Sequence, residues 1–181
     1  MRRARTAGHF FAPAPGLYIP IPSEFSSWGV VPAMDFIDQL MAFLGRSYYV
    51  ALLSAAELHG AAHQRPQVFQ VMVDRSLTDR DIERVRLRFY ERARLADIPT
   101  VLHNSRTTRV QVSSAEATVF DLVERPRDSG ALFNIATIIG ELVDERKLDA
   151  DRLVEVAPSY PLAVVRRLGW LLDRDGEFVE T

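Results

Sequence analysis

The most constraining feature of this sequence is the run RVRLRFYE at residues 84–91, where charged and apolar residues alternate. Its first six positions alternate arginine with apolar side chains: Arg84, Arg86 and Arg88 against Val85, Leu87 and Phe89. Successive side chains of a β-strand point to opposite faces. The run therefore predicts a strand with one apolar face and one basic face.

Other strand signals lie in the same middle third of the chain. VFQVMV (68–73) is apolar and rich in valine, as buried strands are. TVLH (100–103) and TRVQV (108–112) predict a hairpin, although the turn between them contains no glycine. These segments together predict a small antiparallel sheet.

Helical periodicity is found on both sides of this sheet. Apolar spacing predicts helices over 32–44, ended by Gly45, and over 48–59, followed by Gly60 as a C-cap. The short link at 45–47 predicts that these two helices pack as a hairpin. After the sheet, Ser113 to Glu116 have the S-x-x-E form of a capping box, which opens a helix that runs up to Pro126. Further helices are predicted over three ranges: 129–145, 149–157 and 161–173. The fold class is α+β, with a small antiparallel sheet flanked by helices and a helical C-terminal third.

The composition of the chain excludes several classes of protein. The 181 residues include no cysteine, which excludes disulfides, thiol nucleophiles and cysteine-ligated metals. No apolar run approaches 18 residues and the start has no secretory signal, so we expect a cytoplasmic protein that does not span a membrane. The net charge of −2 combines +4 up to Ala115 with −6 from Glu116 onward. Because 21 of the 22 basic residues are arginine, the first part of the chain suits contacts with anionic groups.

No catalytic or cofactor motif is present. The sequence has no G-x-S-x-G elbow, no P-loop and no G-x-G-x-x-G, and its paired carboxylates are interpreted as solvated faces. His59 and His63 have the i, i+4 spacing of a zinc pair, but Gly60 is expected to end the helix between them. We therefore predict a hydrogen-bonded His59, no metal, no cofactor and no catalytic residue. A small-molecule or metal enzyme that uses the two histidines is the weaker alternative.

The arginine row has two interpretations. Side chains on one strand face are about 6.6 Å apart, so Arg84, Arg86 and Arg88 could bind successive anionic groups of a nucleic acid or an acidic protein. Alternatively, the row is a solvated face that opposes edge pairing, with its charge quenched by nearby carboxylates such as Asp79 and Asp81. A second basic cluster at the N-terminus is either a solvated tail or a DNA-contacting arm: Arg2, Arg3 and Arg5.

Four blocks of sequence, in this order and spacing, carry a resemblance to a known family. They are GLYIPIPSEFSSWG (16–29), YYVALLSAAELHGAAHQRPQVFQVMV (48–73), RVRLRF (84–89) with RVQVSSAEATVFDLV (109–123), and PLAVVRRLGWLLDR (161–174). Together they resemble the AbiEi-type antitoxin family over residues 16–174. The second block is the most specific of the four.

The resemblance implies a transcriptional regulator of a type IV toxin–antitoxin (abortive infection, phage defence) system. In that family an N-terminal winged helix-turn-helix binds operator DNA, and the C-terminal domain, which this chain matches, is associated with antitoxin activity. The chain has no recognition helix before the matched region, so we expect residues 1–24 to be the remnant of a wing and linker and 25–181 to be the antitoxin domain.

The expected function is a non-enzymatic antitoxin and regulator domain that counteracts a cognate nucleotidyltransferase toxin. Its expected anionic partner is operator DNA, RNA or an acidic patch on the toxin, bound through the arginine row. The alternative function is a protein-interaction or dimerisation module that has lost DNA binding.

Overall fold

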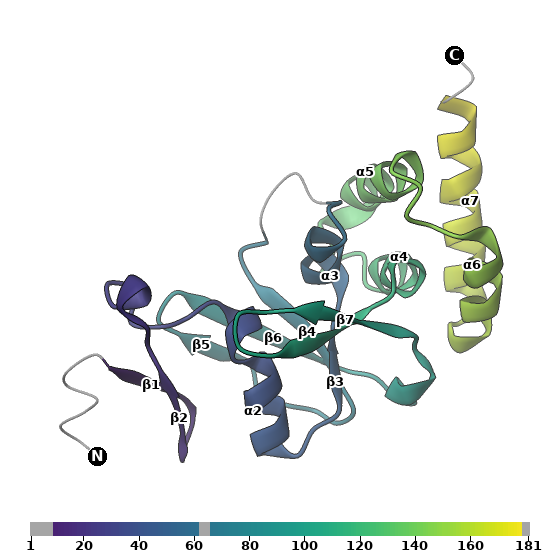
Figure 1. The fold of residues 1–181 in the computed structure, drawn as a ribbon. Helices are drawn as coiled ribbons and strands as arrows, with labels where there is room; N and C mark the ends of the chain where they lie inside the picture. Colours follow the sequence, from purple (N-terminus) through teal and green to yellow (C-terminus); the bar gives the residue numbers. More distant parts are fainter. Residues whose placement is uncertain (1–8, 62–65, 179–181) are drawn as a thin grey trace. The chain divides into compact units, whose positions relative to one another are not determined.

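The computed structural model describes residues 9–61 and 66–178 (Figure 1). The chain divides into two compact units. Unit 1 comprises Met1–Tyr49, Gln67–Leu95 and Leu102–Gln111. Unit 2 comprises Val50–Pro66, Ala96–Val101 and Val112–Thr181. Four elements contain residues of both units: β3 (Tyr48–Val50), η3 (Leu95–Asp97), β7 (Thr100–Asn104) and β8 (Arg109–Ser113).

The other elements of unit 1 are mostly strands. They are β1 (Phe10–Ala14), β2 (Leu17–Pro20), η1 (Ser23–Phe25), η2 (Ala33–Asp35), α2 (Ile37–Leu44), β4 (Phe69–Val73), β5 (Arg80–Ile82) and β6 (Val85–Glu91). Strands β1 and β2 form a two-stranded antiparallel ribbon. The six-stranded sheet has the strand order β5-β6-β4-β3-β8-β7.

The six-stranded sheet is mixed, so the α+β class is confirmed but the expectation of an antiparallel sheet was wrong. Strand β6 is antiparallel to β5 and parallel to β4, with Gln70 beside Arg88. Strand β3 is parallel to β8 through Val50 and Val112. The sequence pattern does not predict β5, because the strand has only three residues and two of them are charged. That strand adds one chain reversal between β4 and β6, which turns an antiparallel pair into a parallel one.

The helix predicted over 48–59 was also partly wrong. Tyr48 to Val50 form strand β3, and the helix α3 begins only at Leu52 and ends at Leu58. The two tyrosines and the valine are all buried, and such side chains favour strands. A continuous apolar run does not distinguish a buried strand from a buried helix, which is why periodicity failed here. The expected helix hairpin across 45–47 is therefore absent from the fold.

The helix predicted over 32–44 is confirmed in its second half. Residues 33–35 form the 3-10 turn η2, and α2 follows and ends as expected at Gly45, which has φ 61° and ψ 44°. The rings of Phe11 and Phe36 meet edge to face at 5.1 Å, so the β1–β2 ribbon contacts the residue that precedes α2. Tyr48 donates a hydrogen bond to Asp38 at 2.9 Å, and burial together with that bond raises the pKa of Tyr48 well above its usual value.

The turn between β7 and β8 explains how a hairpin forms without glycine. The two strands are neighbours in the sheet, as predicted, and the amide of Ser105 donates to the carbonyl of Thr108 at 2.8 Å. The Ser105 hydroxyl oxygen accepts hydrogen bonds from the amides of Thr107 and Thr108. A serine side chain thus closes the turn, which is a known substitute for glycine-based geometry.

The other elements of unit 2 are helical and include the three predicted C-terminal helices. They are α3, α4 (Ala115–Glu124), α5 (Ala131–Asp144), α6 (Ala150–Val156), η4 (Ala157–Ser159) and α7 (Leu162–Phe178). Helix α4 is central: its residues from Glu116 to Val123 are all buried, and it contacts α3, α5, α6 and α7 (Figure 1). A helix that is buried on all sides is the core of its unit.

The start of α4 differs by one residue from the predicted capping box. Ser114 is the N-cap, and its hydroxyl oxygen accepts from the amide of Ala117 at 3.2 Å. The Ser113 hydroxyl instead lies 2.7 Å from the hydroxyl of Thr118. Glu116 accepts a hydrogen bond from the amide of Asp149, at the start of α6, instead of reaching back to the cap.

None of the helices in the described part of the chain combines the length and the hydropathy of a bilayer-crossing segment.

Gly169, in the middle of α7, gives a first testable prediction. A Cβ atom at this position would meet no atom within 4 Å outside the helix backbone. Alanine is about 0.5–1 kcal/mol more favourable than glycine in a helix interior. Gly169→Ala should therefore raise the free energy of unfolding by about that amount, measured by urea denaturation.

Gly45→Ala is the matched control. A Cβ atom there would also meet nothing within 4 Å, but φ is +61°. An L-residue in the left-handed region costs roughly 1 kcal/mol, so this variant should be less stable than the wild type. If both variants shift stability in the same direction, backbone conformation is not what distinguishes the two positions.

Candidate functional site

The basic strand face lies on the hairpin formed by β5 and β6 in unit 1. Ile82 pairs with Val85, and the two residues between them, Glu83 and Arg84, make the turn. Glu83 has φ 51°, a conformation that non-glycine residues rarely adopt outside tight turns. Arg84 therefore lies in the turn, while Arg86 and Arg88 lie on β6 as predicted.

The burial of β6 reproduces the alternation of the sequence around Leu87, whereas Val85 and Phe89 are half-buried, as Arg88 is. Leu87 is fully buried and anchors the strand in the core of unit 1. Arg86 is exposed and Arg88 is half-buried. The strand thus presents its arginines away from the apolar side chain that anchors it, which is what period-two patterning predicts.

Arg88 is already held by two carboxylates. Its Nη1 donates to Asp81 Oδ1 at 2.8 Å, and its Nε lies 3.6 Å from Asp79 Oδ2. The hydrogen bond to Asp81 raises the pKa of Arg88 above its usual value. Asp79 also accepts from the amide of Phe89 at 3.0 Å, so it holds both the strand and the side chain. Arg88 therefore belongs to the internal structure of the hairpin, as the quenching interpretation of the arginine row expected.

Arg84 and Arg86 have no ion pair with any residue that the structure describes. Asp81 lies opposite Arg86 in the strand register, but its carboxylate bonds to Arg88 instead. The Arg84 guanidinium lies 6.0 Å from the centre of the Trp28 ring, and both side chains are exposed. We call Arg84, Arg86 and Trp28 the basic corner. All three side chains of the basic corner are exposed.

The remaining candidates fall outside this hairpin. Arg2, Arg3, Arg5 and His63 lie outside the residues that the structure describes. His59 is hydrogen-bonded as predicted, with Nε2 2.8 Å from the carbonyl oxygen of Ser113, and its own carbonyl accepts from Lys147 Nζ. In the described parts of the chain, no three potential ligands gather around a common point where a metal ion would fit.

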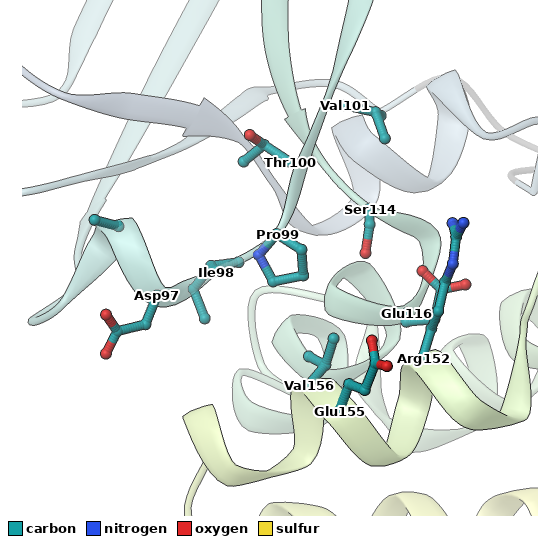
Figure 2. Close-up of a pocket in the computed structure, with 11 residues that line it drawn as sticks. Asp97, Ile98, Pro99, Thr100, Val101, Ser114, Glu116, Arg152, Glu155 and Val156 are labelled. Carbon is teal, nitrogen blue, oxygen red and sulfur yellow. The ribbon is translucent and has the colours of Figure 1, made fainter.

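Sequence reasoning missed a pocket of about 420 Å³ within unit 2 (Figure 2). Its wall is formed by the segment 96–101, by Ser114 and Glu116 at the start of α4, and by α6. The three segments are distant in sequence, and no local pattern marks them. The only available signal was Glu116 itself, which was assigned to a capping box.

Comparison with known proteins identifies the family. The family model described as the AbiEi antitoxin C-terminal domain matches residues 49–174. The chain belongs to this family. The AbiEi match includes the two arginines of the basic corner and every residue of the pocket, whereas Trp28 and the N-terminal arginines precede it.

The chain was also compared with curated proteins and with solved structures. A search of curated protein sequences found no match to the chain. Among solved structures, the chain is similar to the crystal structure of an antigenic nucleotidyltransferase-like protein from Paracoccidioides brasiliensis, with 12% identity and a TM-score of 0.46. That similarity covers 78% of this chain and 90% of the other.

Membership in the AbiEi family gives the domain a toxin–antitoxin role, and an antitoxin implies a toxin as its functional partner.

Proposed function

We propose that this chain is the antitoxin and regulatory domain of a type IV toxin–antitoxin system, and that it counteracts a cognate nucleotidyltransferase toxin without catalysing a reaction. The observation that carries this proposal is the match of the AbiEi antitoxin C-terminal domain over residues 49–174. In this proposal the domain acts in the cytoplasm as part of a phage-defence system.

We further propose that the basic corner binds an anionic partner. Arg84 and Arg86 are exposed and form no ion pair with a described residue, so their guanidinium groups are available to phosphates or carboxylates. Trp28 adds an aromatic surface, and exposed tryptophan and arginine residues are enriched where proteins bind partners. Arg88 contributes less, because a partner would have to displace Asp79 and Asp81.

Residues 1–24 fit a wing remnant in one respect. The part that the structure describes contains the antiparallel β1–β2 ribbon, and a two-stranded ribbon is the form that a wing takes. Operator DNA is therefore retained as a candidate partner for the basic corner, beside RNA and an acidic protein surface. If the partner is DNA, two phosphate contacts predict that log K falls with log salt concentration with a slope of roughly −1.8.

Co-expression tests the antitoxin role and the basic corner separately. Cells that express the cognate nucleotidyltransferase toxin should regain growth when the wild-type chain is supplied. The double variant Arg84→Ala/Arg86→Ala should lose at least about tenfold in colony count, because a pair of charge-assisted contacts is removed. Arg75→Ala/Arg109→Ala removes the same charge from other exposed positions of unit 1 and should rescue like the wild type.

The possible results are distinct. Absence of rescue by the wild-type chain contradicts the antitoxin proposal. Full rescue by the Arg84/Arg86 variant leaves the antitoxin role intact and removes the basic corner from it.

A second candidate function is a protein-interaction or dimerisation module. It is favoured by large apolar side chains that are exposed on unit 2, with Phe133 87% exposed on α5: Leu132, Phe133, Val154, Leu162 and Trp170. Analytical ultracentrifugation distinguishes the two functions, because a dimer whose formation is indifferent to DNA and to the toxin supports the module.

A further inference from the structure

The pocket of unit 2 contains a buried carboxylate that the fold only partly uses. Glu116 is 4% exposed, and its Oε1 accepts from the Asp149 amide at 3.2 Å. Its second carboxylate oxygen has no hydrogen-bond partner among the described residues. Figure 2 shows the Glu116 carboxylate among the side chains that line the pocket. A buried charge with an unfilled hydrogen-bonding position is costly unless something pairs with it.

The other polar groups of the pocket make it acidic. Glu155 extends from α6 toward the cavity (Figure 2) and forms no ion pair with a described residue. Arg152 is the one basic residue of the lining. No salt bridge joins Arg152 to Glu116 or Glu155 in the described residues, so Arg152 does not neutralise these two carboxylates by direct pairing. An acidic lining attracts a cation.

The size and walls of the pocket indicate what kind of cation fits. A volume of about 420 Å³ is in the range of small-molecule sites and much larger than a single ion needs. Ile98, Pro99 and Val156 supply apolar surface beside the carboxylates. Such a combination suits a charged head on a hydrocarbon stem, because the stem buries apolar area while the head pairs with the acid.

The start of α4 does not compete as an anion site. Ser114 caps the helix through the Ala117 amide, and the Glu116 carboxylate already places a negative charge at the first turn. Ser114 lines the cavity, and its hydroxyl oxygen has a second lone pair besides the one that accepts from the Ala117 amide. Both groups are therefore acceptors for donors that enter from the pocket.

We propose that this pocket binds an organic cation, an alkylguanidinium or alkylammonium group, with Glu116 as its principal partner and Glu155 at the rim. The group has two sources: the arginine or lysine side chain of a protein partner, or a free small amine or guanidine. The site is independent of the basic corner, which would bind an anion from unit 1.

The test uses the full chain with two probes and a neutral isostere. The probes are n-butylguanidine, for a free small molecule, and N-acetylarginine amide, for a peptide side chain. N-acetylcitrulline amide has the shape of the second probe without its charge. Methyl NMR signals of Ile98 and Val156 report occupancy. We expect at least one cation to shift both signals, and citrulline to bind about 10- to 100-fold more weakly than arginine.

Variants locate the binding to Glu116. Glu116→Gln keeps the oxygen that accepts from Asp149 and removes the charge, so it should weaken cation binding at least about tenfold. Asp144→Asn removes an equal charge from an exposed position of α5 outside the pocket and should bind like the wild type. Arg152→Gln, also exposed, removes the competing cation and should strengthen binding. This third variant tests the proposal even if Glu116→Gln does not fold.

Different results of these binding experiments support and overturn the cation site. Binding of both cations indicates a partner side chain, and binding of butylguanidine alone indicates a free small molecule; either result supports the site. The proposal is overturned if neither cation shifts the methyl signals, if citrulline binds as well as arginine, or if Asp144→Asn weakens binding as much as Glu116→Gln.

Discussion

Leu122→Ala lowers the free energy of unfolding by about 3 kcal/mol, the largest effect of a single substitution that we expect in this protein. Leu122 is fully buried on α4, the helix that contacts α3, α5, α6 and α7. Truncation removes buried methyl groups and leaves a cavity that four packed helices cannot close without losing their own contacts. Urea denaturation followed by circular dichroism measures the change.

Leu162→Ala is the control for that prediction. It removes the same atoms from α7, but its side chain is 62% exposed. Exposed substitutions of this kind stay within about 0.5 kcal/mol of the wild type. If the two leucines give equal losses, α4 is not the core of unit 2.

Tyr160→Phe is expected to have the second largest effect, a loss of about 2 kcal/mol. The Tyr160 hydroxyl lies 2.8 Å from Oδ1 of Asp121 and 3.1 Å from the carbonyl oxygen of Ala117, and both Tyr160 and Asp121 are buried. The Tyr160 hydroxyl has one proton to donate. It donates that proton to the Asp121 carboxylate and not to the Ala117 carbonyl, because hydrogen bonds to charged groups are stronger. Phenylalanine removes this donor and leaves a buried carboxylate with one fewer hydrogen bond.

Tyr160→Phe removes the hydroxyl and keeps the ring, so it tests the hydroxyl alone. The Tyr160 ring stacks on Phe120 at 4.8 Å, and phenylalanine preserves that contact. Tyr18→Phe, at an exposed tyrosine of β2, should leave the urea midpoint within error of the wild type. A Tyr160→Phe variant as stable as the wild type would mean that the carboxylate is satisfied without the tyrosine.

Elements whose local pattern agrees with their final environment could be predicted from the sequence. Strand β6 could be predicted because Leu87 is buried between the exposed Arg86 and the half-buried Arg88, and α4 to α7 lie where helices were predicted. Strand β3 could not be predicted, since all three of its residues are buried and carry no periodic signal. Strand β5 could not be predicted either: its residues are Arg80, Asp81 and Ile82, a composition typical of turns.

The candidate site was predicted in part, and the missing part has a physical reason. The arginines were found because alternation places them on one face. Asp79 and Asp81 decide which arginine is neutralised, and the pairing of β5 with β6 decides where these two carboxylates lie. Because β5 is not predicted from the sequence, the neutralised arginine could not be predicted either. The pocket around Glu116 is formed by segments that meet only in the folded unit, so no window of sequence contains it.

The shortness of β5 has a consequence for how this protein meets its neighbours in solution. It forms one border of the six-stranded sheet, with only three residues, two of them charged. A foreign strand would find few backbone groups to pair with and would have to desolvate the exposed Asp81 beside it. We therefore expect this border to pair poorly with foreign strands in fibrils or strand-swapped assemblies, and to be recognised through its side chains.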